Sequence, residues 1–236
     1  LRGSSTEPFQ NPIVCNLEGP FAPSLKTYPK VGPALKQHLV AAEALTTLGV
    51  TACTLANNHL SDYGPQGIRS TIDILTHKHI QYTGAASANY RPFRPFVIQL
   101  GNHRVAILAA AQAQFGTAIY DDQEWGVDWI NSPELDTAIA KTKAQGLSVI
   151  VAAHAGAEDV PFPLPEWRHR YHQLLAAGAD FVIGHHPHVP QGIEETEKGT
   201  IFYSLGNFIF PLSKEYNNFL PARVGYAVRI NAVGDK

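Results

Sequence analysis

Three times along the chain, a helical pattern ends in glycine and an apolar run begins at once, at Leu48-Gly49-Val50, Gln145-Gly146-Leu147 and Ala177-Gly178-Ala179. Glycine just past the last turn takes the left-handed conformation that closes a helix. The continuous apolar run after it is typical of a strand buried on both faces. The pattern therefore predicts helix and strand units with parallel strands.

The helices are predicted by apolar spacing and by the residues at their ends. One apolar stripe at helical spacing precedes Gly49, and another follows it. Ser132-Pro133-Glu134 gives a third helix a cap, a first-turn proline and a first-turn acid, and Pro165-Glu166 opens a fourth. The two stripes consist of Leu35, Leu39, Ala42, Leu45 and Leu48, and of Ile68, Ile72 and Leu75.

Elsewhere the pattern favours antiparallel strands. Residues 96–100 and 104–109 flank Gly101-Asn102-His103, which predicts a hairpin. We expect one α/β domain over the whole chain, with a layered α/β/α architecture and a mixed sheet. Further strands are predicted over 200–204, 207–210 and 224–230.

Residues 112–131 are the least regular stretch of the chain. They hold Phe115, Tyr120, Trp125 and Trp129 among acidic residues. Such a stretch is compatible with a lid or substrate wall, and also with an ordinary packed loop, which is the commoner case.

Composition narrows the class of protein. The 236 residues suffice for a substantial core, since 44% are hydrophobic and 16% are charged. No apolar run approaches the ~20 residues that a membrane-spanning helix needs. The formal net charge is −2, so the chain lacks the basic field on which nucleic-acid binding rests, and we expect no nucleic-acid partner.

The cysteines and the first residues each support one expectation. Cys15 and Cys53 lie inside predicted strands, where free cysteine usually acts as a small buried hydrophobe, although the sequence leaves a disulfide open. The chain contains no methionine, and Leu1-Arg2-Gly3-Ser4-Ser5 resembles neither a translation start nor a signal peptide. We therefore expect a fragment or a processed form of something longer.

Polar side chains gather where four predicted strands end. Four of the eleven histidines fall in residues 154–156 and 185–188, directly after apolar runs, and two other runs stop at Leu17-Glu18 and Asn57-Asn58-His59. Ligands of open α/β sheets bind beyond the carboxyl ends of the strands. We therefore expect one edge to carry Glu18, Asn58, His59, His154, His186 and His188.

This combination of side chains favours a metal site. A lone histidine at a strand end is more often structural, but imidazoles, an amide and a carboxylate on four strand ends outweigh that interpretation. Because no thiolate accompanies them, zinc, manganese or iron in a catalytic type of site is favoured over a structural four-cysteine zinc site. We expect one or two divalent transition-metal ions.

The chain also carries five short motifs: Asn16-Leu17-Glu18-Gly19; Ala56-Asn57-Asn58-His59 with Asp62-Tyr63-Gly64 behind it; His154-Ala155-Gly156-Ala157-Glu158; Gly184-His185-His186-Pro187-His188-Val189; and Ser204-Leu205-Gly206-Asn207-Phe208. In order and spacing they resemble the CapA family, which contains the poly-γ-glutamate capsule synthesis proteins. The resemblance covers about residues 10–231. It implies a fold similar to the calcineurin-like metallophosphoesterases.

The resemblance also implies roles for individual residues. Asn58 looks like the amide metal ligand, and His59 like the histidine that donates a proton to the leaving group. His154, His186 and His188 look like imidazole ligands. Glu18 stands where the superfamily has a metal-bridging acid.

Two departures from the family pattern affect these expectations. The family begins with a strand ending in Gly-Asp, whose aspartate is an early metal ligand, and residues 1–11 contain no Gly-Asp. Either the chain starts after that strand or half of one metal position is lost, so the case for two metals is weaker than for one. In addition, Ala155 stands where the family often has tryptophan, which would widen the pocket.

Four more residues of these motifs are candidates for substrate contacts or for support of the metal ligands: Asn57, Glu158, His185 and Asn207. His185 should point to the opposite face from His186 and His188, which favours a supporting or structural role. Glu158 follows His154 closely enough to orient a ligand or bind substrate, and a solvated loop acid is equally compatible. Asn207 lies beyond another predicted strand end.

The residues and the resemblance together predict a metal-dependent hydrolase of the metallophosphoesterase type in bacterial capsule or envelope polymer synthesis. A metal would make hydroxide available at neutral pH, and His59 would protonate the departing oxygen. The bond cleaved is a phosphoester, or an amide or other ester in an anionic polymer. The alternative is a non-catalytic subunit that binds polymer or membrane proteins of a capsule synthesis complex. The resemblance implies an extracytoplasmic place in the cell envelope.

Overall fold

The computed structural model describes residues 11–86, 92–114, 116–119, 125–210 and 220–231. Its helices are α1 (Val40–Thr47), α2 (Gly64–His77), α3 (Pro133–Ala144), α4 (Pro165–Ala176) and the short 3-10 helix η3 (Leu220–Arg223). Its strands are β1 (Ile13–Asn16), β2 (Val50–Thr54), β3 (Gln81–Thr83), β4 (Ala85–Ala86), β5 (Phe96–Leu100), β6 (His103–Ala111), β7 (Gly126–Val127), β8 (Ser148–His154), β9 (Phe181–His185), β10 (Ile193–Thr196) and β11 (Gly199–Phe202).

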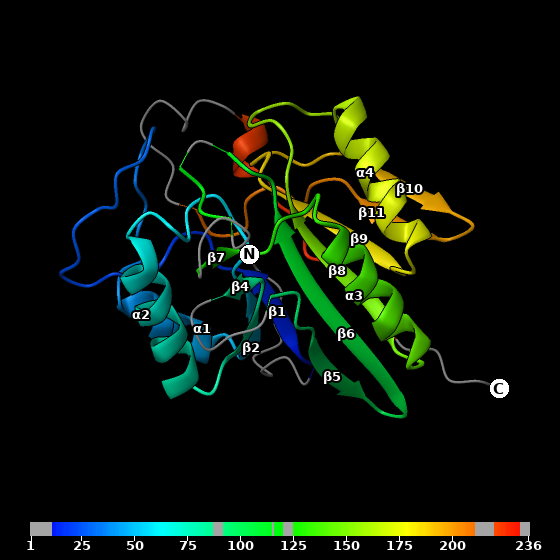
Figure 1. Cartoon of the computed structure of the whole chain (residues 1–236), viewed down its shortest axis with the longest axis horizontal. Helices are drawn as coiled ribbons and strands as arrows, with labels where there is room; N and C mark the ends of the chain where they lie inside the picture. Colours follow the sequence, from blue (N-terminus) through cyan, green and yellow to red (C-terminus); the bar gives the residue numbers. More distant parts are fainter. Residues whose placement is uncertain (1–10, 87–91, 115, 120–124, 211–219, 232–236) are drawn as a thin grey trace.

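Two sheets form the centre of the molecule (Figure 1). The larger has the strand order β10-β11-β9-β8-β6-β5, in which the four inner strands are parallel and each edge strand is antiparallel to its neighbour. The smaller has the order β1-β2-β3 and is entirely parallel. The predicted α/β class with a mixed sheet is confirmed, and the strands are divided between two main sheets.

The alternating side chains of β6 explain how the layers pack. Leu108 and Ala110 face one way and join a core with residues of α3, α4 and β8. Ala109 and Ala111 face the other way and join the core that contains β2, α1 and α2 residues. Because both faces of β6 are covered, its run of seven buried residues, Val105–Ala111, is continuous and not alternating.

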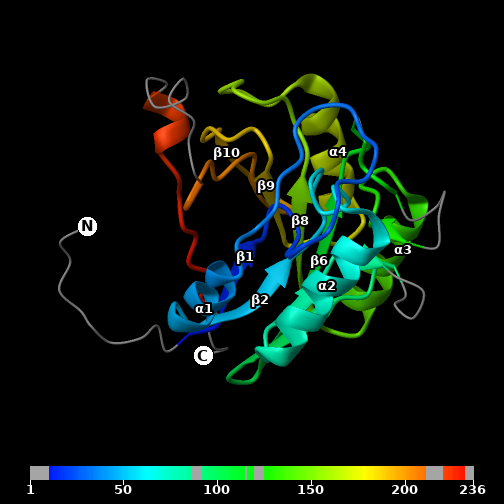
Figure 2. The same ribbon diagram turned by 90° about the vertical axis from the view of Figure 1, so that its left-hand side faces the viewer.

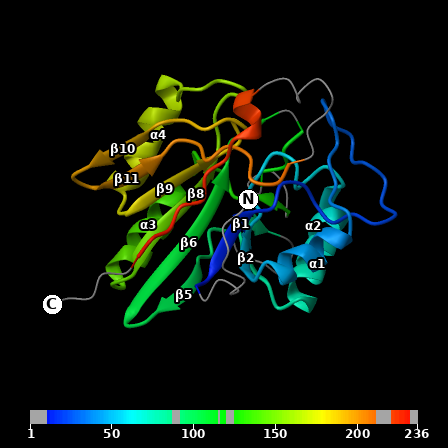
Figure 3. The same ribbon diagram turned by 180° about the vertical axis from the view of Figure 1, so that it is seen from behind.

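Helices cover the outer sides of the two sheets. Figure 2 shows α1 and α2 in front of β1 and β2, and Figure 3 shows the large sheet from behind, from β10 to β5. Ser132 caps α3 as predicted, because its hydroxyl oxygen accepts from the Glu134 amide at 3.4 Å. Gly49 ends the α1 region at φ 74°, the left-handed value that the sequence pattern requires.

Small residues let the two sheets approach closely near their carboxyl ends. Gly84 follows β3 at φ 90°, and a Cβ there would lie 2.8 Å from the Cβ atoms of both Ala56 and Ala109. Ala56 follows β2 and Ala109 lies on β6, so this contact joins the two sheets. The strand ends that carry the polar motifs are thereby brought to one region.

Two predicted elements differ from the structure. The helix before Gly49 begins only at Val40, so Leu35 precedes it, and Leu39 and Leu48 are exposed because α1 is too short to bury the whole stripe. Residues 207–210 and 224–230 are not strands. The only β-bridge to either range within the described residues is an isolated one between Gly206 and Gly225, and the side chains of Phe208 and Ile209 are exposed and not buried as a strand of the core would be.

The irregular stretch and the cysteines follow the simpler expectations. Trp125 and Trp129 pack against the core beside the small sheet, as in an ordinary packed loop, while Phe115 and Tyr120 lie outside the described residues. Cys15 and Cys53 are free thiols paired in register on β1 and β2, with 3.7 Å between the sulfur atoms. Cys53 is fully buried and Cys15 only partly, so the expected burial holds in full for one of them.

Gly184 on β9 tests the packing beneath the strand ends. A Cβ there would lie 1.9 Å from the Tyr203 carbonyl oxygen, and the other nearest atoms also belong to the backbone of Phe202 and Tyr203, which cannot yield as a side chain can. We expect Gly184→Ala to destabilise the fold by about 1–3 kcal/mol or more, measured as the urea midpoint. The control is Gly192→Ala, which meets nothing within 4 Å. Equal midpoints for the two variants would contradict this account.

Candidate metal centre

Asn57 joins the ends of β1 and β2. Its side-chain amide donates to the Leu17 carbonyl at 2.8 Å and to the Leu55 carbonyl at 3.1 Å. Its side-chain oxygen accepts from the amides of His59 at 3.1 Å and Gly19 at 3.3 Å. All four hydrogen bonds are internal to the protein, so Asn57 fixes the turns that carry Glu18 and His59 and has no donor or acceptor left for a substrate.

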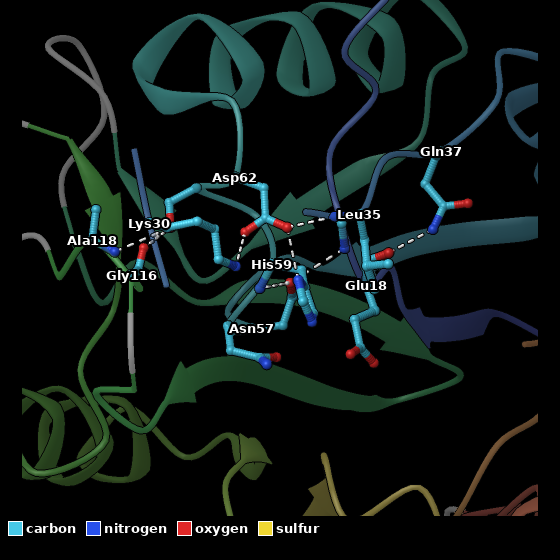
Figure 4. A network of polar contacts seen from close by, with 12 residues as sticks. Glu18, Lys30, Leu35, Gln37, Asn57, His59, Asp62, Gly116 and Ala118 are labelled. Carbon is cyan, nitrogen blue, oxygen red and sulfur yellow. Dashed lines mark hydrogen bonds and ion pairs between the residues drawn. The ribbon is translucent and has the colours of Figure 1, made fainter. Parts of the chain in front are cut away.

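His59 is oriented by Asp62, three residues further along the same turn. The ring Nδ1–H donates to Oδ2 of Asp62 at 2.7 Å, and the Asp62 side chain is fully buried (Figure 4). This pairing leaves Nε2 as the ring nitrogen available to a substrate. Asp62 lies in a quoted motif, but the sequence alone gave it no role.

His154 and Asn58 meet across the two sheets. His154 ends β8, and its Nε2 lies 2.8 Å from the Asn58 side-chain oxygen in the turn after β2. The ring of His186 lies beside that of His154, with 4.9 Å between centroids. These three side chains come from separate strand ends, as the sequence predicted.

His186 and His188 lie in a tight turn after β9 whose backbone is unusual. Both residues have positive φ, 95° and 58°, values that non-glycine residues seldom adopt. The turn is held by its neighbour, because the Pro187 carbonyl accepts from the Asp159 amide at 2.9 Å. Such strain at a ligand-bearing turn is typical of functional sites.

His188 connects this turn to β1 and to the C-terminal segment. Its Nδ1 pairs with the Asn207 side-chain oxygen at 2.9 Å, and Asn207 in turn donates to the Ala222 carbonyl at 3.0 Å. Its Nε2 lies 3.6 Å from Oε1 of Glu18. Asn207 therefore sets the orientation of the His188 ring, which points its other nitrogen at the carboxylate.

Glu158 approaches the same turn from the loop after β8. Its carboxylate lies 3.9 Å from Nε2 of His186, and one ligand atom each from Glu158, His186 and His188 lie within 4.8 Å of one another. Gln112 holds the base of that loop, because its side chain both donates to and accepts from the backbone of Gly156. Gln112 could not be recognised from the sequence, since nothing distinguishes it there from an ordinary strand-end glutamine.

Burial controls the charge of the site. Desolvation lowers the pKa of His186 to about 3, with His188 and His59 acting in the same direction, and it lowers the pKa of His154 well below its usual value. Desolvation also raises the pKa of Glu18, and His188 opposes that rise. His185, which ends β9, has a pKa lowered by burial to about 4. Neutral imidazole is the form that binds metal.

Several ligand-type atoms here are buried and have no hydrogen-bond partner. Among the described residues these include Glu18 Oε1, His154 Nδ1 and both ring nitrogens of His186, whose side chain is fully buried. A buried polar atom without a partner costs about 1–3 kcal/mol. Imidazole and carboxylate atoms that converge without partners suit a divalent transition metal, so the residues present fit the ion predicted from the sequence.

The structure thus links all five residues predicted as metal ligands through successive contacts, from Glu18 through His188, His186 and His154 to Asn58. Glu158 and Asn207 lie in the same group, and His59 is close enough to interact electrostatically with Glu18, His154 and His186. The hydrogen bonds of Asn57 instead go to backbone groups in the turns beneath. By strand alternation His185 shares the face of Phe181 and Ile183 on β9, towards the core between the sheets. The structure does not test the fate of the family's Gly-Asp strand, because residues 1–11 contain no Gly-Asp and residues 1–10 lie outside the described part of the chain.

The geometry defines a class of protein: an α/β domain in which histidines and acidic residues gather at the ends of the strands. The model of the family described as Bacterial capsule synthesis protein PGA_cap matches residues 10–212, so the chain belongs to that family. The resemblance to CapA proteins seen in the sequence is confirmed.

Two curated relatives illustrate the similarity. The capsule biosynthesis protein CapA of Bacillus anthracis is 36% identical over 182 residues, covering 73% of this chain and 44% of that protein. The PGA biosynthesis protein CapA of Bacillus subtilis (strain 168) is 29% identical over 177 residues, covering 75% and 47%. The chain spans somewhat less than half the length of these relatives.

Solved structures with a similar arrangement include two from Thermus thermophilus. The sulfate thiohydrolase SoxB is 13% identical, covers 70% of this chain and 29% of that one, and has a TM-score of 0.49. The 5'-nucleotidase precursor of the same species is 18% identical, covers 65% and 29%, and has a TM-score of 0.44. Within the described residues, no helix has both the length and the apolar character needed to cross a membrane.

The unpartnered His186 ring gives a test that needs no activity. Because both ring nitrogens are buried without partners, His186→Leu should not destabilise the metal-free protein, and we expect a gain of about 1 kcal/mol. Thermal unfolding with a chelator measures this. Asn57→Leu is the control, and it should instead destabilise the protein by ~2–5 kcal/mol, because four hydrogen bonds are lost. A loss at His186 as large as that at Asn57 would mean that His186 is an ordinary structural residue.

Proposed function

We propose that this chain is the metal-dependent hydrolase region of a protein of capsule or poly-γ-glutamate synthesis, located at the bacterial cell envelope. The observation that carries the proposal is the buried His186 side chain, which lies beside other ligand-type atoms and whose two ring nitrogens have no hydrogen-bond partner among the described residues. Family membership supports the polymer pathway, since the relatives are named for capsule and PGA biosynthesis.

Five side chains are proposed as ligands of a zinc, manganese or iron ion: Glu18, Asn58, His154, His186 and His188. Glu158 is available as a further carboxylate, because it lies within ligand range of the two histidines of the turn. One ion is the simplest occupancy. Asn207 and Gln112 serve by holding the His188 ring and the Glu158 loop in place.

When bound, such an ion supplies a Lewis acid and lowers the pKa of water at the site. The protein's own part in the reaction centres on His59. Asp62 accepts from Nδ1 and so fixes the ring, which leaves Nε2 to give a proton to the departing oxygen. Burial of the histidines around it keeps their rings uncharged, which is the form that binds metal. The positive charge of the bound ion would then favour an anionic group in the substrate.

The proposed substrate is a phosphoester or an anionic polymer in which an amide or other ester is cleaved. Membrane proteins of a capsule synthesis complex are the proposed partners, and no nucleic acid is expected because the chain has a net charge of −2. A polymer-binding subunit without catalysis is the alternative that the experiments below separate from a hydrolase.

Metal binding is the first test. After incubation with zinc, manganese or iron and desalting, elemental analysis should find about one ion per chain in the wild type and little in a His186→Ala, His188→Ala double variant. The control is the His77→Ala, His79→Ala double variant at the end of α2, which should bind like the wild type. Less than about a tenth of an equivalent in the wild type would exclude the metal site.

The second test separates the roles of His59 and Asn58. If His59 donates a proton and holds no metal, the His59→Ala variant should keep its ion. It should lose ~10²–10⁴ in rate on substrates with poor leaving groups and less on substrates with good ones. Asn58→Ala should weaken metal binding and lower both rates. A panel of aryl phosphates, phosphodiesters and capsule polymer is the assay, with the full-length protein. If the metal-loaded wild type cleaves none of them, the binding-subunit function replaces the hydrolase.

A further inference from the structure

A buried ion pair lies directly behind His59. The ammonium of Lys30 pairs with Oδ1 of Asp62, and the side chains are only 6% and 0% exposed. Lys30 belongs to the segment between β1 and α1, which has little regular structure, yet its charge is placed in the interior. A lysine this buried needs a specific partner, and its partner is the carboxylate that orients the proposed proton donor.

Asp62 uses both of its oxygens. Oδ1 accepts from the Lys30 ammonium, while Oδ2 accepts from the Leu35 amide at 2.6 Å and from Nδ1–H of His59 at 2.7 Å (Figure 4). Each donor fixes one side of the carboxylate, so its plane cannot rotate without breaking a bond. The direction of the His59 ring is therefore determined by the same contacts.

The charge of Lys30 matters because Asp62 is out of contact with water. An isolated buried carboxylate is costly, and removing one partner of a buried pair leaves an uncompensated charge. With Lys30 in place, Asp62 acts as an acceptor only, which fixes the proton of His59 on Nδ1 and leaves Nε2 to the substrate.

The position of Lys30 is itself constrained by packing. The amide of Tyr28 donates to the Asp62 carbonyl at 2.8 Å, which fixes the chain two residues earlier. On the other side Gly116, at φ 81°, covers the stem, since a Cβ there would lie 2.4 Å from the Lys30 Cβ. The other two lysines of this segment, Lys26 and Lys36, are exposed. Lys30 alone of the three is built into the interior.

We propose that Lys30 is a positioning residue for the hydrolysis described above, and that it acts through Asp62 on His59. This inference rests on the proposed function for its catalytic meaning, although its structural content does not. The ion pair of Lys30 goes to Asp62 and not to a proposed metal ligand. Its effect is to balance the charge of the buried Asp62 carboxylate and to hold that carboxylate correctly turned, so that Nε2 of His59 meets the leaving group.

The first measurement is spectroscopic and needs no turnover. In the full chain with ¹⁵N-labelled histidine, the Nδ1–H proton of His59 should give a slowly exchanging, downfield NMR signal, assigned by its loss in His59→Gln. Lys30→Met should shift or broaden this signal, because the Asp62 acceptor is no longer held. The control Lys26→Met should leave it unchanged. If Lys30→Met does not fold, Lys30→Gln, which keeps the stem and removes the charge, takes its place.

The second measurement is a double-mutant cycle on activity. Lys30→Met should lose ~10-fold or more on poor leaving groups, keep its metal, and lose little on good ones. In an Asp62→Asn background the same substitution should have almost no additional effect, because a residue that acts through Asp62 has nothing left to act on.

The outcomes are distinct. An unchanged His59 signal in Lys30→Met, equal losses on all leaving groups, or additive effects of the two substitutions would each overturn the role of Lys30. Absence of turnover in the wild type would instead overturn the proposed hydrolase, and the NMR comparison would still decide whether Lys30 sets the His59 ring.

Discussion

The close approach of the two sheets is the constraint on which the site depends. Gly84, Ala56 and Ala109 leave no side-chain volume between β3, β2 and β6 at their carboxyl ends. A larger residue at any of these positions would hold the sheets apart, and Asn58 from one sheet would no longer reach His154 from the other. The small residues of these strands therefore have a specific use, since they give up buried apolar area in order to let polar side chains from both sheets meet.

The same region has features that lower the stability of the fold, and packing of the core elsewhere compensates for that loss of stability. His186 and His188 have left-handed backbone conformations, and several ligand-type atoms of Glu18, His154 and His186 are buried with no hydrogen-bond partner among the described residues. Rigid support surrounds these features, including the four hydrogen bonds of Asn57 and the paired bonds between Gln112 and Gly156. Polar groups arranged in this way lose little further entropy when they bind an ion, which is the physical meaning of preorganisation.

Much of this could be predicted from the sequence, because the signals were local. Glycine-ended helices, apolar runs and the polar residues that follow them indicated the α/β class and brought Glu18, Asn58, His154, His186 and His188 to one edge. The division into two main sheets could not be predicted, since β1 and β2 have the same apolar character as β6, β8 and β9, and only tertiary packing separates them. Lys30 was missed for a similar reason: its segment reads as a polar loop, and the contact with Asp62 spans 32 positions of sequence.

Asp62 couples the stability of a long irregular segment to that of the candidate site. Its backbone carbonyl and its carboxylate hold Tyr28, Lys30 and Leu35, so residues 28–35 are attached to the site turn by hydrogen bonds and not by their own regular structure. Opening of this segment therefore breaks the support of His59 at the same moment. We therefore expect the segment and His59, the proposed proton donor, to form one cooperative unit with a shared local free energy of opening, on which amide hydrogen exchange at Tyr28 and Leu35 would report.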